Sequence, residues 1–254
     1  MTYDLNGNMT SDGTNSYSWD AENRLIKVTY PGSGNNSQFS YDGFGRNVSI
    51  VETVSGSVTS TKMFVWSSDK FRQFRPCEAR NSSSSVTAQY FPLGETISGT
   101  SYFYTSDHLG LTQSEITASD FSSSDVLDDH PDGFNPILEV GSTREMTNSS
   151  GALQSQLSYD AFGRPTQLQG STSPDFQYAG YYFHSPSGLG LTLARAYSGS
   201  LGRFLGRDIV EEDDEDVGPN RYAYVLNNPT SFVDPLGMES VARTTDLEFQ
   251  CGCS

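Results

Sequence analysis

The chain has 254 residues, enough for one large domain or two small ones. Only 35% of the residues are hydrophobic, yet 12% are aromatic and 24 are glycines, which favours strands and turns over helices. The formal net charge of −16 would repel a phosphate backbone, so we expect no nucleic-acid partner. No apolar run is long enough to cross a bilayer, so we expect no membrane span.

A six-residue pattern recurs along the chain. Its copies are YDLNGN at 3–8, WDAENRL at 19–25, YDGFGR at 41–46 and YDAFGR at 159–164. Segments with the composition of strands lie between the copies, at 25–30, 47–54, 57–66 and 84–91. This spacing predicts repeated units, each made of a strand, a turn and a returning strand.

The hexapeptide has the composition of a tight turn. Asp42 and Asp160 can accept hydrogen bonds from backbone amides just ahead of them, and Gly45 and Gly163 can adopt the positive φ that reverses the chain. We expect the aromatic residues to pack on neighbouring units and the arginine to extend along the next strand. Because each unit leaves a sheet edge and an open face, the units must stack, and we interpret the motif as structural rather than catalytic.

The negative charge is concentrated in two segments. Residues 111–141 contain seven acidic residues and no Lys or Arg, and 211–216 reads EEDDED; outside them 18 acidic residues face 15 basic ones. The first segment is Ser-rich and contains proline, as in an exposed excursion. Its DDHPDG stretch at 128–133 could attract Ca²⁺, but it lacks the alternating acids of a calcium loop.

Other ligand and modification residues give weak signals. Three cysteines without a C-x-x-C pair, and three scattered histidines, argue against a metal site, and we expect no metal and no cofactor. These residues are Cys77, Cys251, Cys253, His108, His130 and His184. Candidate glycosylation sites in N-x-S/T sequons are Asn8, Asn35, Asn47, Asn81 and Asn148.

Together with four longer stretches, the hexapeptides resemble the YD-repeat, or Rhs (rearrangement hotspot), family. The stretches are YFYTSDHLG, STREMTNSSGAL, YAGYYFHSPSGLGLTLARAYSGSLGRFLGRD and GPNRYAYVLNNPTSFVDPLGM. The resemblance covers roughly residues 3–110 and 142–238. It implies that YD repeats spiral into a β-sheet shell and that a core region closes one end. In this family the core is often an intramolecular aspartyl protease that releases a variable C-terminal segment, frequently a toxin.

Three features depart from the family pattern. Residues 111–141 separate DHLG from STRE, and the Asp-Pro that usually follows GRF is Asp208-Ile209. The tail 239–254 is only 16 residues long, too short to fold as an independent domain.

The resemblance nominates residues for self-cleavage. Asp208 and Asp234 match the family's two aspartates, and an aspartyl mechanism needs one ionised and one protonated carboxyl group close together. Arg207 is the adjacent charged group, and the bond to be cut would be Met238-Glu239. The alternative is that the Asp234-Pro235 stretch with its glycine is a plain turn and that Asp208 simply pairs with Arg207. We further expect EEDDED to raise carboxylate pKa values and to weaken cleavage near neutral pH.

These observations predict an all-β fold in which antiparallel strand-turn units form a curved or spiral sheet, a partial β-shell. We divide the chain into a YD-repeat region 1–110, an inserted segment 111–141, a core region 142–238 and a tail 239–254. One function is that of a secreted or cell-surface structural protein whose sheet edges are completed by self-association or by upstream YD repeats. The other is self-cleavage after Met238. The first residues show no signal peptide, so we expect a mature chain or part of a longer protein.

Overall fold

The structure is a computed structural model that describes residues 1–66, 75–107, 141–208 and 220–238, together with the backbone of 241–242. Strands dominate this part of the chain. Apart from them, only short 3₁₀ segments form regular structure among the described residues, including η2 (Tyr178–Gly180) and η4 (Val225–Asn227). The predicted all-β fold is confirmed.

The largest element is a sheet of fourteen antiparallel strands, which we call the main sheet. Each strand pairs with the next one along the chain. The strands are β1 (Thr2–Tyr3), β2 (Met9–Ser11), β3 (Ser16–Trp19), β4 (Leu25–Thr29), β5 (Asn36–Tyr41), β6 (Asn47–Val54), β7 (Ser57–Trp66), β8 (Pro76–Arg80), β9 (Val86–Phe91), β10 (Gly94–Ile97), β11 (Thr100–Ser106), β12 (Thr143–Asn148), β13 (Leu153–Tyr159) and β14 (Pro165–Gly170). Within the described residues, β1 and β14 have one partner each, so the sheet is not closed.

Six turns of the main sheet share one geometry, and we call them the repeat turns. In each, the side-chain Oδ1 of the first residue accepts the amides two and four residues later, at 2.8–3.0 Å. The fourth residue always has a positive φ, 77° at Gly45 and 82° at Gly163. The first residues are Asp4, Asp20, Asp42, Asn81, Asn148 and Asp160. The structure therefore has the turn that the hexapeptide composition indicated.

The predicted packing of the aromatic residues holds for Tyr41, Tyr159 and Phe162 and is wrong for Phe44. Phe162 packs in an aromatic cluster, whereas Phe44 is 83% exposed. The Arg46 side chain was expected only to extend along the next strand. It also folds back on Asp42, with Nη2 at 2.8 Å from the carboxylate. Two hexapeptides that differ at one residue thus form the same turn in different surroundings.

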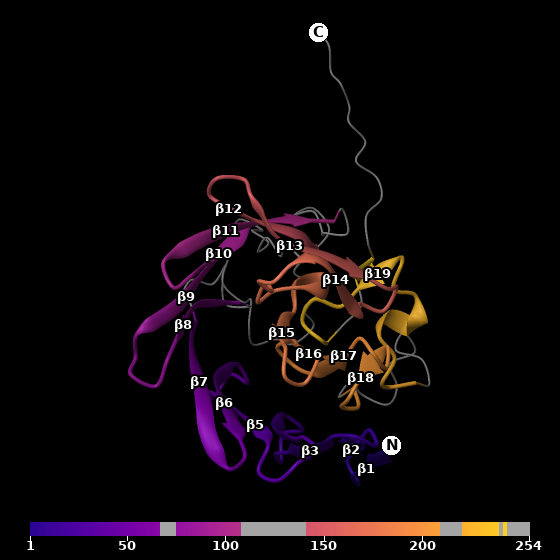
Figure 1. Cartoon of the computed structure of the whole chain (residues 1–254). Coiled ribbons are helices and arrows are strands. Elements are labelled where there is room, and N and C mark those ends of the chain that lie inside the picture. The colour runs from indigo at the N-terminus through magenta and orange to yellow at the C-terminus, as the bar shows by residue number, and fades with distance from the viewer. Residues whose placement is uncertain (67–74, 108–140, 209–219, 239–240, 243–254) are drawn as a thin grey trace, which may run out of the picture.

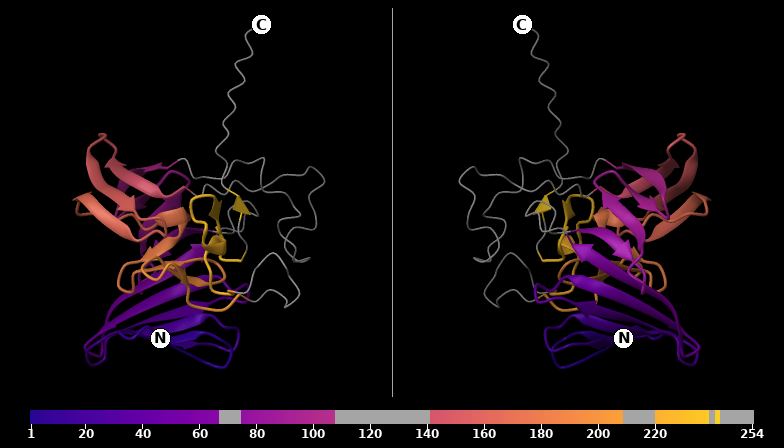
Figure 2. Two further views of the ribbon diagram at one scale, coloured as in Figure 1. Left: turned by 90° about the vertical axis from the view of Figure 1, so that its right-hand side faces the viewer. Right: turned by 90° about the vertical axis from the view of Figure 1, so that its left-hand side faces the viewer.

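A second group of elements, which we call the core body, lies inside the curve of the main sheet. It contains a four-stranded sheet and a pair of short strands. Their bounds are β15 (Tyr182–His184), β16 (Leu189–Leu191), β17 (Ala196–Ser198), β18 (Arg203–Phe204), β19 (Phe232–Val233) and β20 (Val241–Ala242). In Figure 1 the main sheet follows an arc from indigo to salmon, with β15–β18 inside it and residues 220–238 (yellow) at its open side; Figure 2 gives the side views.

One hydrophobic core joins the two parts. Alternate residues of the main sheet, among them Val28, Phe39 and Ile50, are buried on the inner face, as the two-residue period of a strand requires. Leu189 and Leu205 of the core body belong to the same cluster. The main sheet also includes β12–β14. Residues 142–170, which the sequence analysis assigned to the core region, therefore lie in the same sheet as the predicted 1–110 region.

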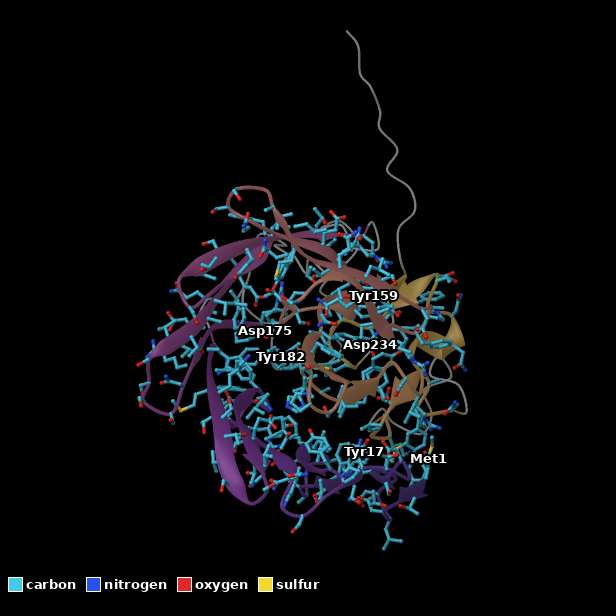
Figure 3. All side chains as sticks on the ribbon, in the orientation of Figure 1. Met1, Tyr17, Tyr159, Asp175, Tyr182 and Asp234 are labelled. Carbon is cyan, nitrogen blue, oxygen red and sulfur yellow. The ribbon has the colours of Figure 1, made fainter. Side chains whose placement is uncertain are left out.

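Polar contacts also hold the core body in the main sheet. His184 Nε2 lies 2.7 Å from Glu52 Oε1, and Lys62 Nζ donates to Asp175 Oδ2 at 3.0 Å. Figure 3 labels Asp175 beside the main sheet and Asp234 within the core body. The core body is therefore fixed by both apolar and charged contacts, and it can hold a site in a defined geometry.

Candidate active site

Asp208 and Asp234 come from different elements of the core body. Asp208 follows β18, and its amide donates to the carbonyl oxygen of Arg221 at 2.9 Å. Asp234 follows β19 and begins the turn that leads to β20. Their side chains are 12% and 3% exposed, so both carboxylates are largely removed from water.

Arg195 brings these two carboxylates together. Its Nη1 lies 2.6 Å from Asp208 Oδ2, and its Nη2 donates to Asp234 Oδ2 at 3.0 Å. The contact with Asp208 is an ion pair without the angles of a hydrogen bond. The Arg195 side chain is 9% exposed, and its Cζ lies 3.8 Å from the ring centroid of Phe204, which fixes the guanidinium plane.

The same groups hold the segment before the predicted scissile bond, residues 234–238, which we call the strap. Arg195 Nε donates to the Gly237 carbonyl oxygen at 2.5 Å, and the Met238 amide donates to Asp234 Oδ1 at 2.9 Å. The Ala194 amide donates to the Leu236 carbonyl oxygen at 3.1 Å. The strap is therefore bound along its backbone, ending one peptide short of the predicted cut.

The turn of the strap shares two features of the repeat turns: Asp234 Oδ1 accepts the amide four residues later, and the fourth residue has a positive φ. The Gly237 amide donates to the Asp234 carbonyl oxygen at 3.4 Å, and Gly237 has a φ of +73°. The Tyr181 hydroxyl donates to the same carbonyl oxygen. Asp234 thus forms the turn that the alternative interpretation described, and its second carboxylate oxygen faces Arg195 as well.

Arg207 lies beside the first repeat turn, and its role in positioning or charge stabilisation stays a prediction. It is exposed, and its Cβ and Cδ would lie 3.4 Å from a Cβ placed on Gly7, so it lies against the first repeat turn. The sequence missed Arg195 as the residue in contact with both aspartates. No local pattern marks it, because its position in LTLARAYS reveals nothing about which acids it meets.

This arrangement has the parts for hydrolysis of the chain's own peptide. Two carboxylates flank one guanidinium, and a fixed backbone segment leads directly to the candidate bond. An aspartyl mechanism requires one of the two carboxyl groups to be protonated, and Arg195 stabilises the charge of the other. Glu239 and residues 211–216 lie outside the described residues, so the predicted effect of EEDDED stays a prediction.

The candidate glycosylation sites, cysteines and histidines lie in different environments. Asn8 is 1% exposed, and its amide bonds to Asp4 and Asn23, while both amide atoms of Asn47 are enclosed. Neither can therefore carry a glycan in the folded chain, whereas Asn35, Asn81 and Asn148 are partly exposed. Cys77 is a free thiol. His108, His130, the other two cysteines and most of 111–141 are outside the described residues.

The described part of the chain contains neither a cluster of metal-ligating side chains nor a helix that could span a membrane. No group of three or more His, Cys, Asp or Glu side chains there could hold a metal ion. No helix there is both long and apolar enough to cross a membrane.

A second buried acidic pair, which the sequence did not reveal, joins the core body to the main sheet. Glu95 is 0% exposed, and its Oε1 accepts the Asp175 amide at 3.3 Å. Asp175 Oδ2 accepts from Tyr90 Oη at 2.6 Å and from Lys62 Nζ at 3.0 Å. Burial, and next the Asp175 carboxylate, raise the pKa of Glu95 to about 7.

His184, which the sequence analysis treated as a scattered histidine, also joins the core body to the main sheet. Its Nδ1 lies 2.7 Å from Ser187 Oγ, and its Nε2 meets Glu52. Burial acts to raise the pKa of Glu52, but hydrogen bonds from His184 and Ser37 outweigh it, so that pKa is lowered. The cluster is a hydrogen-bonded anchor between β6 and β15.

Comparisons with known proteins agree with the fold and the repeats. The RHS Repeat family model matches residues 19–58. The chain is similar to the tRNA3(Ser)-specific nuclease WapA of Bacillus spizizenii, with 31% identity over 248 residues, and to the tRNA nuclease WapA of Bacillus subtilis strain 168, with 30% identity over 249 residues. Each match covers 93% of this chain and only 9% of the relative's length.

Two solved structures share the fold. The crystal structure of TcdB2-TccC3 matches with a TM-score of 0.56 and 19% identity, covering 93% of this chain and 11% of that one. A Tc holotoxin pore of Photorhabdus luminescens matches with a TM-score of 0.60 and 16% identity, covering 96% of this chain and 11% of that one. From its repeat turns, its open fourteen-stranded sheet and these matches, the chain belongs to the Rhs, or YD-repeat, family.

Proposed function

We propose that this chain is a self-cleaving core of a YD-repeat shell and that it cuts its own backbone between Met238 and Glu239. The observation that carries the proposal is the position of Arg195. Its guanidinium contacts both Asp208 and Asp234 and also binds the carbonyl group of Gly237. One side chain thus joins the two acids to the strap that precedes the bond.

The proposed reaction is a single hydrolysis. The ionised carboxylate removes a proton from a water molecule, whose oxygen attacks the carbonyl carbon of Met238. The protonated carboxyl group gives its proton to the amide nitrogen of Glu239, and the carbon–nitrogen bond breaks. Because the fold holds the strap in place, no separate substrate groove is needed, and the effective concentration of the bond is very high.

Intact-mass measurement of purified chain tests the proposal. We expect a species ending at Met238 and a 16-residue peptide. Asp208→Asn and Asp234→Asn should both abolish release. Asp160→Asn is the matched control, since Asn81 and Asn148 occupy the same position in other repeat turns. Release that persists in both site variants contradicts the mechanism.

A second role concerns the edge of the main sheet. Within the described residues, β1 has only β2 as a partner, which leaves one side of it open for another strand. We propose that upstream repeats or a second copy pair there, in a secreted or cell-surface protein. Sedimentation over a wide concentration range tests pairing between copies, and we expect Tyr3→Pro to weaken it. A monomer at every concentration would contradict pairing between copies.

The nuclease activity in the relatives' names belongs to much longer proteins. This chain matches 9% of the length of each, so the nuclease activity is no part of this proposal.

A further inference from the structure

The strap contains one position with no room for a side chain. Gly237 has a φ of +73°, and a Cβ placed there would overlap Oγ1 of Thr192. The same Cβ would lie 3.0 Å from Thr192 Cβ and 3.3 Å from the Arg195 amide nitrogen. Position 237 is therefore restricted both by its backbone conformation and by its neighbours.

Thr192 cannot move aside without loss. Its Oγ1 donates to the Arg195 carbonyl oxygen at 2.7 Å and accepts from the Arg195 amide at 2.9 Å. Arg195 is in turn held by Asp208 and Asp234. A rotation of the threonine that made room at 237 would break both bonds and disturb the guanidinium that joins the two acids.

Much of the rest of the strap is bound through its backbone. The Leu236 and Gly237 carbonyl oxygens are bound by the Ala194 amide and by Arg195 Nε. Met238 is bound through its amide, and its side chain is 41% exposed. The Leu236 side chain is buried, but Gly237 is the position at which the surroundings leave no room for a Cβ.

We infer that Thr192 is a specificity-determining residue, which restricts the strap to an Asp-x-x-Gly turn by excluding every side chain at position 237. The inference rests on the proposed self-cleavage and names the substrate of that site as this glycine turn in the chain itself. A larger residue at 237 displaces the strap from Arg195 and moves the scissile bond away from the two carboxylates.

The first test compares two glycines. Gly237→Ala should slow release of the C-terminal peptide by about a hundredfold, because misplacement by about 1 Å costs that much in a proximity-driven reaction. Gly188→Ala is the matched control: its φ is +68°, and no atom lies within 4 Å of the added Cβ. It carries the backbone strain without the clash, and it should leave release within about threefold of the unaltered chain. An equal loss in both variants overturns the inference.

The second test uses Thr192→Ala, which removes the overlapping Oγ1. The penalty of Gly237→Ala should be clearly smaller in the Thr192→Ala background than in the unaltered chain, because residues in contact give non-additive effects. The double variant is compared with the Thr192→Ala single variant, because Thr192→Ala by itself removes the two hydrogen bonds to Arg195 and changes the rate of release. An equal penalty in both backgrounds overturns the inference.

A third measurement separates this inference from the proposed cleavage. In the uncleaved Asp208→Asn chain, hydrogen exchange at the Met238 amide reports whether the strap is bound, because that amide donates to Asp234 Oδ1. Gly237→Ala should accelerate this exchange and Gly188→Ala should not. If the unaltered chain releases no peptide, the proposed function fails, but exchange at the Met238 amide still tests whether Thr192 excludes side chains at position 237. Unchanged exchange in Gly237→Ala refutes that exclusion.

Discussion

Replacement of Glu95 by glutamine should make the protein more stable at neutral and alkaline pH. Glu95 is completely buried between β10 and the core body, next to the Asp175 carboxylate. Its pKa is raised from an ordinary 4.5 to about 7 by burial first and by Asp175 second. Glutamine keeps an oxygen that can accept the Asp175 amide and cannot ionise.

The sign and size of this effect on the free energy of unfolding follow from the linkage between proton binding and folding. Below a pH of about 4.5 Glu95 is neutral in both the folded and the unfolded chain, and it contributes no pH dependence. Between about 4.5 and about 7 only the unfolded chain loses the proton, so the free energy of unfolding falls as pH rises. At about 1.4 kcal/mol per pKa unit, the loss reaches about 3 kcal/mol above pH 7. Glu95→Gln removes this loss.

Urea unfolding at a series of pH values measures the effect. The variant and the unaltered chain should differ least near about pH 4, and the variant should be more stable by up to about 3 kcal/mol near about pH 8. Glu22→Gln is the control, because its side chain is 71% exposed and should give no comparable trend. A Glu95→Gln difference that stays constant with pH would refute the reasoning.

Three further predictions concern the main sheet. Gly45→Ala should lower the free energy of unfolding by about 1 kcal/mol because Gly45 has a positive φ. Gly163→Ala should lower it by at least about 1 kcal/mol more, because the added Cβ would overlap the Tyr178 ring. Thermal unfolding measures both effects. Asp42→Asn should be nearly neutral by the same assay, whereas Asp42→Ala should cost about 1 kcal/mol or more by leaving two amides unpaired. Deletion of 111–141, joining Gly110 to Ser142, should leave soluble folded protein, since the Asp107 and Ser142 backbones are hydrogen-bonded; insoluble protein contradicts this.

The sequence by itself determined the local structure of this protein. The side chain of a repeat-turn Asp or Asn reaches only amides two and four residues ahead, and a single residue supplies the positive φ, so the hexapeptide contains everything that its turn requires. The strand-like composition of the segments between the turns is equally local, and it predicted the all-β antiparallel sheet. The two aspartates came from the family resemblance.

Tertiary structure alone decided which distant side chains meet. Arg195 contacts Asp208 and Asp234 because three separate segments of the core body converge on it. Glu52 and His184 are 132 residues apart in the chain, yet they share a hydrogen bond. YDGFGR and YDAFGR form the same turn, but only the second is covered by the core body, so Phe162 is partly buried and Phe44 is exposed. Such contacts depend on how the main sheet curves around the core body, and no spacing within the chain encodes that curvature.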